Sequence, residues 1–271
     1  MLPDPRAVLS RAAPVPDATV RYGDGPDQVA DVRLPAALGG PARPLVVVIH
    51  GGFWRSEYDR GHTSPLAADL AARGYPVAQL EYRRTGQVGG GWPGTLADAV
   101  AGVTALPGLV AGVLAAADRP AGAAGSGPAV GAPLLVGHSA GGQLALYCAR
   151  SVPERVGGVL ALAPVSDLAE AYRLDLDGGA VAELLGGGPA EFPERYAAAD
   201  PRQHVPLQSR TVVIHGGLDQ QVPAGMSRRY AAVAGPNCRL IELPDCEHFG
   251  LIDPESAAWP TVTAALRSLH R

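Results

Sequence analysis

The chain has 271 residues, of which 22 are basic and 26 acidic, so its formal net charge is −4 at pH 7. This mildly acidic balance lacks the basic excess of nucleic-acid-binding proteins, so we expect no nucleic-acid partner. Every basic residue is Arg, which excludes a Schiff-base lysine and the phosphate-binding lysine of a P-loop.

Short apolar runs alternate with Ala-rich segments of helical character along most of the chain. Repeated strand–helix units predict an α/β fold with a mostly parallel central sheet and helices on both faces. At the N-terminal end, runs 19–22 and 28–34 are separated by GDGPD, which predicts an antiparallel hairpin at the sheet edge. In chain order the further predicted elements are strand 45–49, helix 65–73, strand 76–82, helix 95–106, strand 134–136, helix 141–150, strands 156–162 and 211–214, helix 224–234, strand 239–243 and helix 255–269.

Two segments interrupt this alternation. Residues 120–133 are of low complexity and predict a flexible surface loop. Residues 167–206 are longer than a strand–helix connection needs and show weak helical patterns at 179–185 and 192–198. We expect them to form a short cap-like insertion over the strand ends, where sheets of this kind bind ligands. Because the sequence shows no internal repeat and no second core, we predict a single domain for residues 1–271.

The three cysteines are too few and too irregularly spaced for a disulfide framework or a zinc site, so we expect neither a metal nor an organic cofactor. Residues 1–17 lack the apolar stretch of a signal peptide, and the longest apolar runs span only about five to eight residues. The sequence therefore predicts a cytoplasmic protein without membrane contact. It leaves a homodimer open.

Residues 137–141 read GHSAG, directly after a predicted strand and before a helix of small residues. This is the G-x-S-x-G pattern of a nucleophile elbow, in which a strained turn raises the serine hydroxyl above the sheet. Any side chain at Gly137 or Gly141 would collide with the turn or with the start of the helix. The pattern predicts Ser139 as a nucleophile, with an ordinary tight turn as the alternative interpretation.

A second motif, HGGFW at residues 50–54, follows another predicted strand. Adjacent glycines at a strand end allow backbone N–H groups to point into a cleft, where they can stabilise the oxyanion of a tetrahedral intermediate. We therefore predict an oxyanion hole built from the amides of Gly52, Phe53 and Ala140.

The remaining two motifs supply an acid and a base. Asp219 follows a strand in HGGLDQQVP, and His248 follows the last strand in EHFG. In these places His248 can take a proton from Ser139 while Asp219 orients the imidazole. Asp219 can instead, or in addition, cap the helix that follows. His50 and His215 are interpreted as residues that brace their loops.

The motifs together resemble an α/β-hydrolase of the hormone-sensitive-lipase-like esterase group. Within that group, the sequence is most similar to kynurenine formamidase (arylformamidase) and related bacterial esterases. In this family the serine, aspartate and histidine fall on Ser139, Asp219 and His248. The resemblance spans about residues 22–259 and rests on HGGFW at 50–54, EYRR at 81–84, WP at 92–93, Asp98, GHSAGG at 137–142, APVSDL at 163–168, HGGLDQQVP at 215–223 and EHFGLIDP at 247–254.

The resemblance implies a serine hydrolase that forms an acyl-enzyme on Ser139 and removes the formyl group of an N-formyl aromatic amine. A small-molecule carboxylesterase of short-chain or aromatic acyl esters is the alternative, followed by an acyltransferase and a non-catalytic ligand-binding protein. The small-molecule substrate is expected to contact Phe53, Trp54 and His138. For Trp54 a place in the packed core is equally consistent with the sequence. His138 is expected to face away from the nucleophile and not to be the base.

Overall fold

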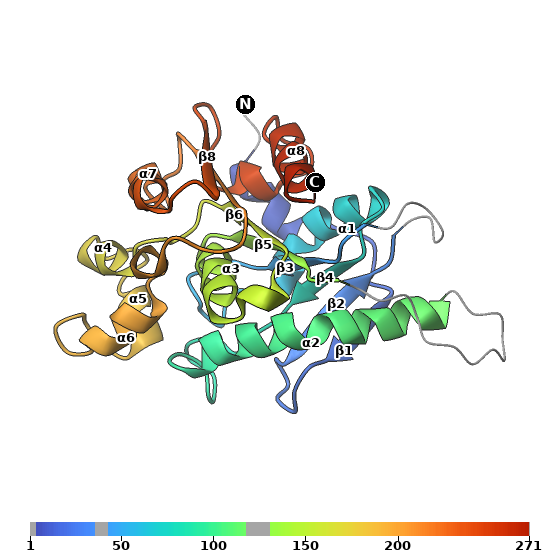
Figure 1. Cartoon of the computed structure of the whole chain (residues 1–271), viewed down its shortest axis with the longest axis horizontal. Coiled ribbons are helices and arrows are strands. Elements are labelled where there is room, and N and C mark those ends of the chain that lie inside the picture. The colour runs from blue at the N-terminus through green and yellow to red at the C-terminus, as the bar shows by residue number, and fades with distance from the viewer. Residues whose placement is uncertain (1–3, 36–42, 118–130, 271) are drawn as a thin grey trace.

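The computed structural model describes residues 4–35, 43–117 and 131–270. Eight strands form one sheet in the order β1-β2-β4-β3-β5-β6-β7-β8 (Figure 1). β1 pairs with β2 and β2 with β4 in antiparallel orientation, and all other neighbours are parallel. The predicted edge hairpin and the mostly parallel sheet are therefore confirmed. The strands are β1 (Ala18–Arg21), β2 (Val29–Arg33), β3 (Val46–Ile49), β4 (Val77–Leu80), β5 (Leu134–His138), β6 (Gly158–Leu162), β7 (Thr211–Gly216) and β8 (Cys238–Leu243).

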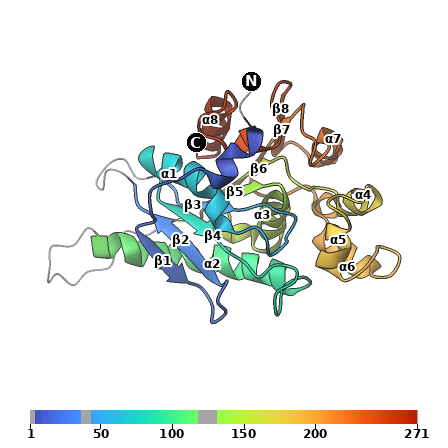
Figure 2. The ribbon, with the colours of Figure 1, turned by 180° about the vertical axis from the view of Figure 1, so that it is seen from behind.

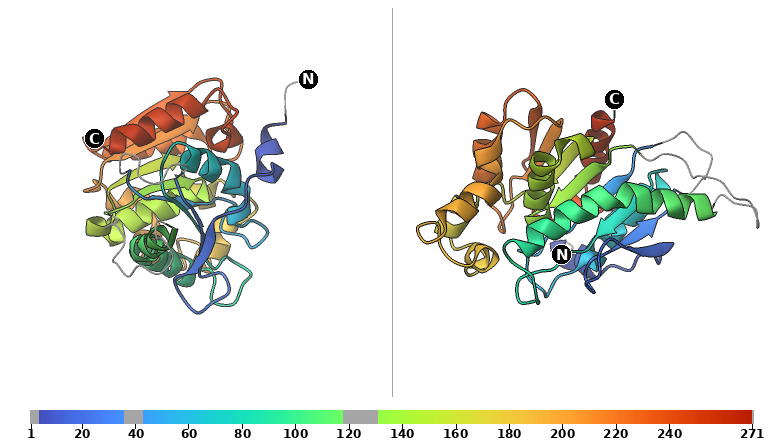
Figure 3. Two further views of the ribbon diagram at one scale, coloured as in Figure 1. Left: turned by 90° about the vertical axis from the view of Figure 1, so that its right-hand side faces the viewer. Right: turned by 60° about the horizontal axis from the view of Figure 1, so that its bottom comes forward.

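Helices cover both faces of the sheet, as expected (Figure 3). Along β3, Val47 and Ile49 point to the core under α2, α3 and α7, while Val46 and Val48 point to the core under α1 and α8. This alternation is the period of two that a strand buried on both faces requires. The covering helices are α1 (Ser64–Ala72), α2 (Gly94–Ala117), α3 (Ala140–Ser151), α7 (Ala224–Val233) and α8 (Trp259–Leu269).

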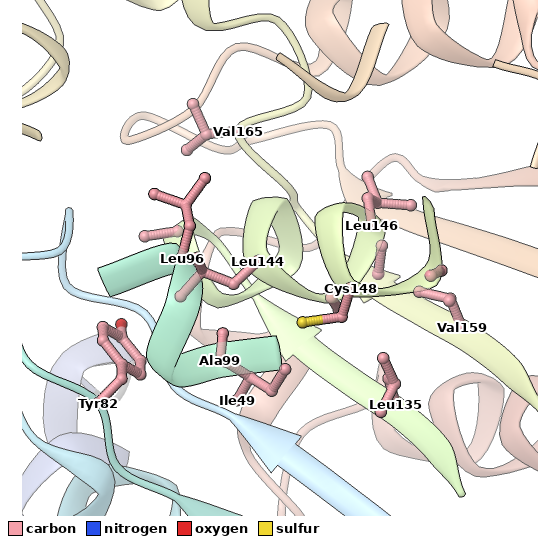
Figure 4. Close-up of a cluster of buried hydrophobic side chains, with 14 of the residues drawn as sticks. Ile49, Tyr82, Leu96, Ala99, Leu135, Leu144, Leu146, Cys148, Val159 and Val165 are labelled. Carbon is pink, nitrogen blue, oxygen red and sulfur yellow. The ribbon is translucent and has the colours of Figure 1, made fainter. Parts of the chain in front are cut away.

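The larger core cluster lies between α2, α3 and the sheet (Figure 4). Leu96 and Ala99 of α2 meet Leu144 of α3 there, and Ile49 and Leu135 come from the strands beneath. All of these side chains are at most 1% exposed. Burial of this kind stabilises the fold by about 25 cal/mol per Å² of apolar surface. Because the core is closely packed, it fixes the positions of the strand ends that carry the motifs.

Helix α2 is longer than the sequence predicted. The expected helix 95–106 continues through Pro107 to Ala117. By length and composition α2 could cross a membrane, so the expectation that no apolar run reaches that length was wrong. In the structure its buried side chains pack on the sheet, which is what the apolar core helix of a globular fold also does.

Residues 167–206 form three short helices and a 3₁₀ turn beside the sheet (Figures 1 and 2). Two of the helices were predicted and the first was not. Residues 120–130 of the predicted flexible loop lie outside the described residues, and one domain for residues 1–271 stays a prediction. The elements of the insertion are α4 (Leu168–Arg173), α5 (Ala180–Leu185), α6 (Pro193–Ala199) and the 3₁₀ turn η4 (Pro201–His204). The other 3₁₀ turns are η1 (Pro5–Ser10), η2 (Arg60–Thr63), η3 (Pro153–Arg155) and η5 (Phe249–Ile252).

Candidate active site

Ser139 occupies the sharp turn between β5 and α3. Its backbone has φ 57° and ψ −119°, a strained conformation for a residue with a side chain. The flanking glycines permit the turn, because a Cβ at Gly137 would lie 2.2 Å from the carbonyl oxygen of Gly141. A Cβ at Gly141 would lie 2.0 Å from the carbonyl oxygen of Ile49. The turn is therefore a nucleophile elbow in its geometry, and the small residues of GHSAG are a steric requirement.

Asp219 follows β7 and His248 follows β8. Because these two strands are parallel neighbours, both residues lie at the same edge of the sheet. The Nδ1 atom of His248 donates to Asp219 Oδ2 over 2.6 Å, which leaves Nε2 of the ring as the acceptor. Asp219 Oδ1 accepts hydrogen bonds from the amides of Gln221 and Val222, each at 2.8 Å. Asp219 thus fixes its own loop and does not cap α7, whose N-cap residue makes no side-chain bond.

The environment of Asp219 keeps its carboxylate charged. Burial alone would raise its pKa, but hydrogen bonds from His215, His248 and the Val222 amide hold that pKa well below its usual range. His215 Nε2 lies 3.2 Å from Asp219 Oδ2 and 2.9 Å from the carbonyl oxygen of Val222. His215 therefore braces the loop, as predicted, and also supports the negative charge beside His248.

The HGGFW loop turns its backbone toward Ser139. Gly52, Phe53 and Trp54 have φ angles of 105°, 49° and 59°, an unusual run in the left-handed region. Within residues 4–35, 43–117 and 131–270, the amides of Gly52 and Phe53 donate to no protein acceptor. Ala140 is the first residue of α3, so its amide has no partner within the helix. Gly52 and Phe53 line the cavity described below, whereas Ala140 is fully buried and is not among its lining residues.

Two contacts hold this loop against the nucleophile. A Cβ at Gly51 would lie 3.0 Å from the Cβ of Ser139, so only glycine allows the approach. Trp54, which we expected at the substrate, is fully buried instead, and its indole N–H donates to Gln143 Oε1 over 3.1 Å. The expectation of substrate contact for Trp54 was wrong, because its strained backbone turns the ring into the core. Gln143 also donates to the carbonyl oxygen of Ala199, which links the loop, α3 and the insertion.

A buried ion pair lies under the loop. His50 donates from Nε2 to Glu81 over 2.9 Å and from Nδ1 to the carbonyl oxygen of Gly51 over 2.8 Å. Each ring nitrogen thus lies beside an acceptor oxygen. The ring also stacks on Tyr82 with centroids 4.4 Å apart. His50 thus braces the loop, as predicted.

A small cavity of about 70 Å³ lies beside Ser139, and the predicted residues Asp219, Ala140 and Trp54 are not among those that line it. Ser139, His248, Gly52, Phe53 and His138 all line it. We expected His138 to face away from the nucleophile, but that expectation was wrong, because His138 lines the cavity with Ser139. Its ring lies 4.4 Å from that of His248, and its Nε2 donates to the carbonyl oxygen of His248 over 3.1 Å. Burial keeps its pKa well below the usual value, so His138 is a neutral wall residue that supports the base.

Other parts of the chain complete the wall, and sequence reasoning missed them. Tyr58 and His62 come from the stretch after HGGFW, and burial lowers the pKa of His62 to about 4. No local motif identifies Tyr58 or His62 as site residues. The one available signal was that His62 follows HGGFW closely in the sequence. The further lining residues that were missed include Arg6, Leu9, Asp177 and Phe249.

The arrangement can perform nucleophilic chemistry on a carbonyl carbon. It combines a raised serine hydroxyl, an imidazole oriented by a buried carboxylate and free amides beside them. Across the described ranges, no group of three or more His, Cys, Asp or Glu side chains is placed to hold a metal ion.

The comparisons with known proteins agree with this geometry. The model of the prolyl oligopeptidase family matches residues 62–251, well over half of the chain. The comparison with curated proteins gave no match.

Solved structures of esterases share the fold. Esterase B from Lactobacillus rhamnosis superposes with a TM-score of 0.74 at 22% identity, covering 98% of this chain and 89% of that one. A thermophilic esterase from Thermogutta terrifontis with bound butyrate gives a TM-score of 0.67 at 20% identity, covering 93% and 92% of the two chains. A bifunctional GH43-CE protein of Bacteroides eggerthii gives 0.73 at 18% identity and covers 92% of this chain, which spans only 37% of that protein. These likenesses establish the α/β-hydrolase fold and do not single out the formamidase group.

Proposed function

The chain belongs to the prolyl oligopeptidase family, and we propose that it is a serine hydrolase that cleaves small carboxylic esters through an acyl-enzyme on Ser139. One observation carries the proposal: Ser139, His248 and the HGGFW loop border the same cavity, and Asp219 is hydrogen-bonded to His248. The separate motifs of the sequence are therefore parts of one site.

In the acylation step, the Ser139 hydroxyl attacks the ester carbonyl carbon and transfers its proton to Nε2 of His248. The negative charge that develops on the carbonyl oxygen is stabilised by the amides of Gly52, Phe53 and Ala140. Asp219 stabilises the imidazolium through the 2.6 Å hydrogen bond to Nδ1. The imidazolium then protonates the departing alcohol, and the acyl group stays on Ser139.

Deacylation repeats these steps with water. His248 takes a proton from the water, whose oxygen attacks the acyl carbon, and then returns the proton to Ser139. Apart from the substrate and this water, the proton transfers involve only Ser139, His248 and Asp219. If an alcohol or amine replaces the water, the same residues perform acyl transfer.

The cavity favours a small acyl group. Its volume of about 70 Å³ leaves room for an acyl chain of a few atoms beside Ser139, and the ring of Phe53 forms part of the wall. The short butyrate held by the Thermogutta terrifontis esterase is in keeping with this size. We therefore place acetyl and similar short esters ahead of long-chain ones.

A series of 4-nitrophenyl esters from acetate to octanoate tests the proposal. We expect kcat/KM to be highest for the shortest esters and to fall steeply beyond butyrate. The Ser139→Ala variant should lose at least about 10³-fold in kcat while keeping its fold. A Ser139→Ala variant that retains turnover, or a preference for octanoate, would contradict the proposal. A blocked peptide 4-nitroanilide, measured in parallel, should be left intact.

The second candidate is hydrolysis of an N-formyl aromatic amine, favoured by the HGGFW and EHFGLIDP motifs and by the small cavity. Formyl is the smallest acyl group, and Phe53 and Phe249 provide aromatic contacts for an aryl leaving group. Turnover of N-formylkynurenine beside 4-nitrophenyl acetate distinguishes the two candidates. Ser139-dependent release of formate at the higher kcat/KM would favour the formamidase, and ester cleavage alone the esterase.

A further inference from the structure

The N-terminal turn η1 forms part of the catalytic cavity through Arg6 and Leu9. Two anchors hold it there. Val8 is 1% exposed in the core beneath α1 and α8. Arg11 binds Asp253 with its Nη2 atom 3.0 Å from Oδ2. Both anchors follow Arg6 closely in sequence, so they fix the turn that carries it.

The guanidinium of Arg6 lies over an aromatic ring. Within the described ranges of the chain, no carboxylate lies within ion-pair distance of its guanidinium, whose central carbon is instead 5.6 Å from the centre of the Phe249 ring. Asp4, the nearest acid in sequence, caps η1 by accepting a hydrogen bond from the backbone amide of Arg6 over 2.9 Å. The side chain of Arg6 is exposed and lines the cavity, so its charge is accessible to a ligand.

An acidic side chain, that of Asp177, also lines the cavity, and an arginine holds it. Asp177 accepts from Arg55 Nε over 2.7 Å, and the same guanidinium binds Glu183 over 2.7 Å. These three side chains carry one positive and two negative charges, so the group keeps a net charge of −1. Arg6 is a cationic side chain in the cavity lining that takes no part in this group.

The position of Arg6 relative to His248 determines which part of a bound substrate Arg6 can contact. The Phe249 ring under Arg6 lies 5.1 Å from the ring of His248. Because His248 must protonate the leaving group, the leaving group of a bound ester lies on this side of Ser139. We propose that Arg6 binds a carboxylate on the leaving group, so that the preferred substrates are esters or formyl amides whose alcohol or amine part is anionic. This inference rests on the proposed function.

A matched pair of substrates tests it: 4-acetoxybenzoate, whose leaving group carries a carboxylate, and its neutral analogue 4-acetoxybenzamide. We expect the wild-type protein to prefer the anionic ester by about 10-fold in kcat/KM, as a charge-assisted hydrogen bond provides. Arg6→Gln should abolish this preference by raising KM for the anionic ester about 10-fold. Arg6→Glu should reverse it. The control Arg150→Gln removes the same charge from the exposed end of α3 and should leave the preference intact.

Binding gives a readout that does not need turnover. In the Ser139→Ala protein, the Kd of 4-acetoxybenzoate should rise about 10-fold when Arg6→Gln is added, and the Kd of 4-acetoxybenzamide should not change. Equal binding of the two ligands, or equal losses for both, would overturn the role of Arg6 even if the esterase activity is present. Absence of turnover together with selective binding of the anion would instead overturn the proposed function and leave the anion site standing.

Discussion

Replacing Asp219 with asparagine is the most direct test of how this site works. The two oxygens of the carboxylate have different partners. Oδ1 accepts from the amides of Gln221 and Val222 at 2.8 Å, and Oδ2 accepts from His248 Nδ1 at 2.6 Å. Every partner is a donor, so the NH₂ group of an asparagine must face a donor in either orientation.

The structure predicts which orientation is adopted. Turning the NH₂ group toward the two backbone amides would break two hydrogen bonds of 2.8 Å. Turning it toward His248 breaks the 2.6 Å bond and the longer 3.2 Å contact with His215, whose Nε2 keeps the carbonyl oxygen of Val222 as its acceptor. In the second orientation the imidazole can accept only after its proton moves to Nε2, which leaves no base for Ser139. The same change of tautomer costs about 10⁴-fold in kcat in the trypsin-like serine proteases. We therefore expect Asp219→Asn to lower kcat by about 10³- to 10⁴-fold, or roughly 4–5.5 kcal/mol in activation free energy.

Steady-state hydrolysis of 4-nitrophenyl acetate measures this loss, with circular dichroism to verify the fold. Asp245→Asn is a matched control, because Asp245 is an exposed acid on the loop before His248. It should retain wild-type kcat. If Asp219→Asn kept more than about a tenth of the activity, the carboxylate could not be what fixes the tautomer of His248. The acid of the site would then have to be another residue.

Three further predictions concern the framework of the site. Gly141→Val should lower the Tm by roughly 5–10 °C, because overpacking costs a few kcal/mol, and a thermal melt within 1 °C of wild type would contradict the clash. Burial would raise the pKa of Glu81, but His50 and nearby donors outweigh it and lower that pKa from 4.5 to about 2. Glu81 therefore contributes up to about 3 kcal/mol above pH 4.5, lost as the pH falls toward 2. In urea unfolding from pH 7 to pH 3, Glu81→Gln should remove this dependence, and an unchanged slope would refute it. Arg55→Ala removes two partly exposed ion pairs, each worth about 1 kcal/mol or less, so the Tm should fall by no more than a few degrees. Hydrogen exchange in residues 167–206 should nevertheless accelerate, and equal exchange would show that Arg55 does not hold the insertion.

The sequence alone determined the buried strands and the GHSAG turn, because both depend on short-range geometry. Each buried strand was recognisable because a strand covered on both faces is apolar along its length. The GHSAG turn was recognisable because Gly137 and Gly141 are the residues that such a close turn permits. The order of Ser139 and the acid and base motifs along the chain then placed them at the same edge of a parallel sheet, since parallel strands end on one side.

Other features depend on contacts between segments that are far apart in the sequence, and only the tertiary structure decided them. Trp54 could have lined the cavity or the core, and the strained backbone of its loop directed it inward to Gln143. His138 was expected to face away, yet the loop that carries His248 folds back over it. Helix α2 continued through a proline because its apolar side chains are packed on the sheet, a gain that local propensity does not include. Arg6 became part of the wall only because Val8 and Arg11 anchor the N-terminal turn beside the strand ends. Such contacts join residues far apart in sequence, so no local pattern encodes them.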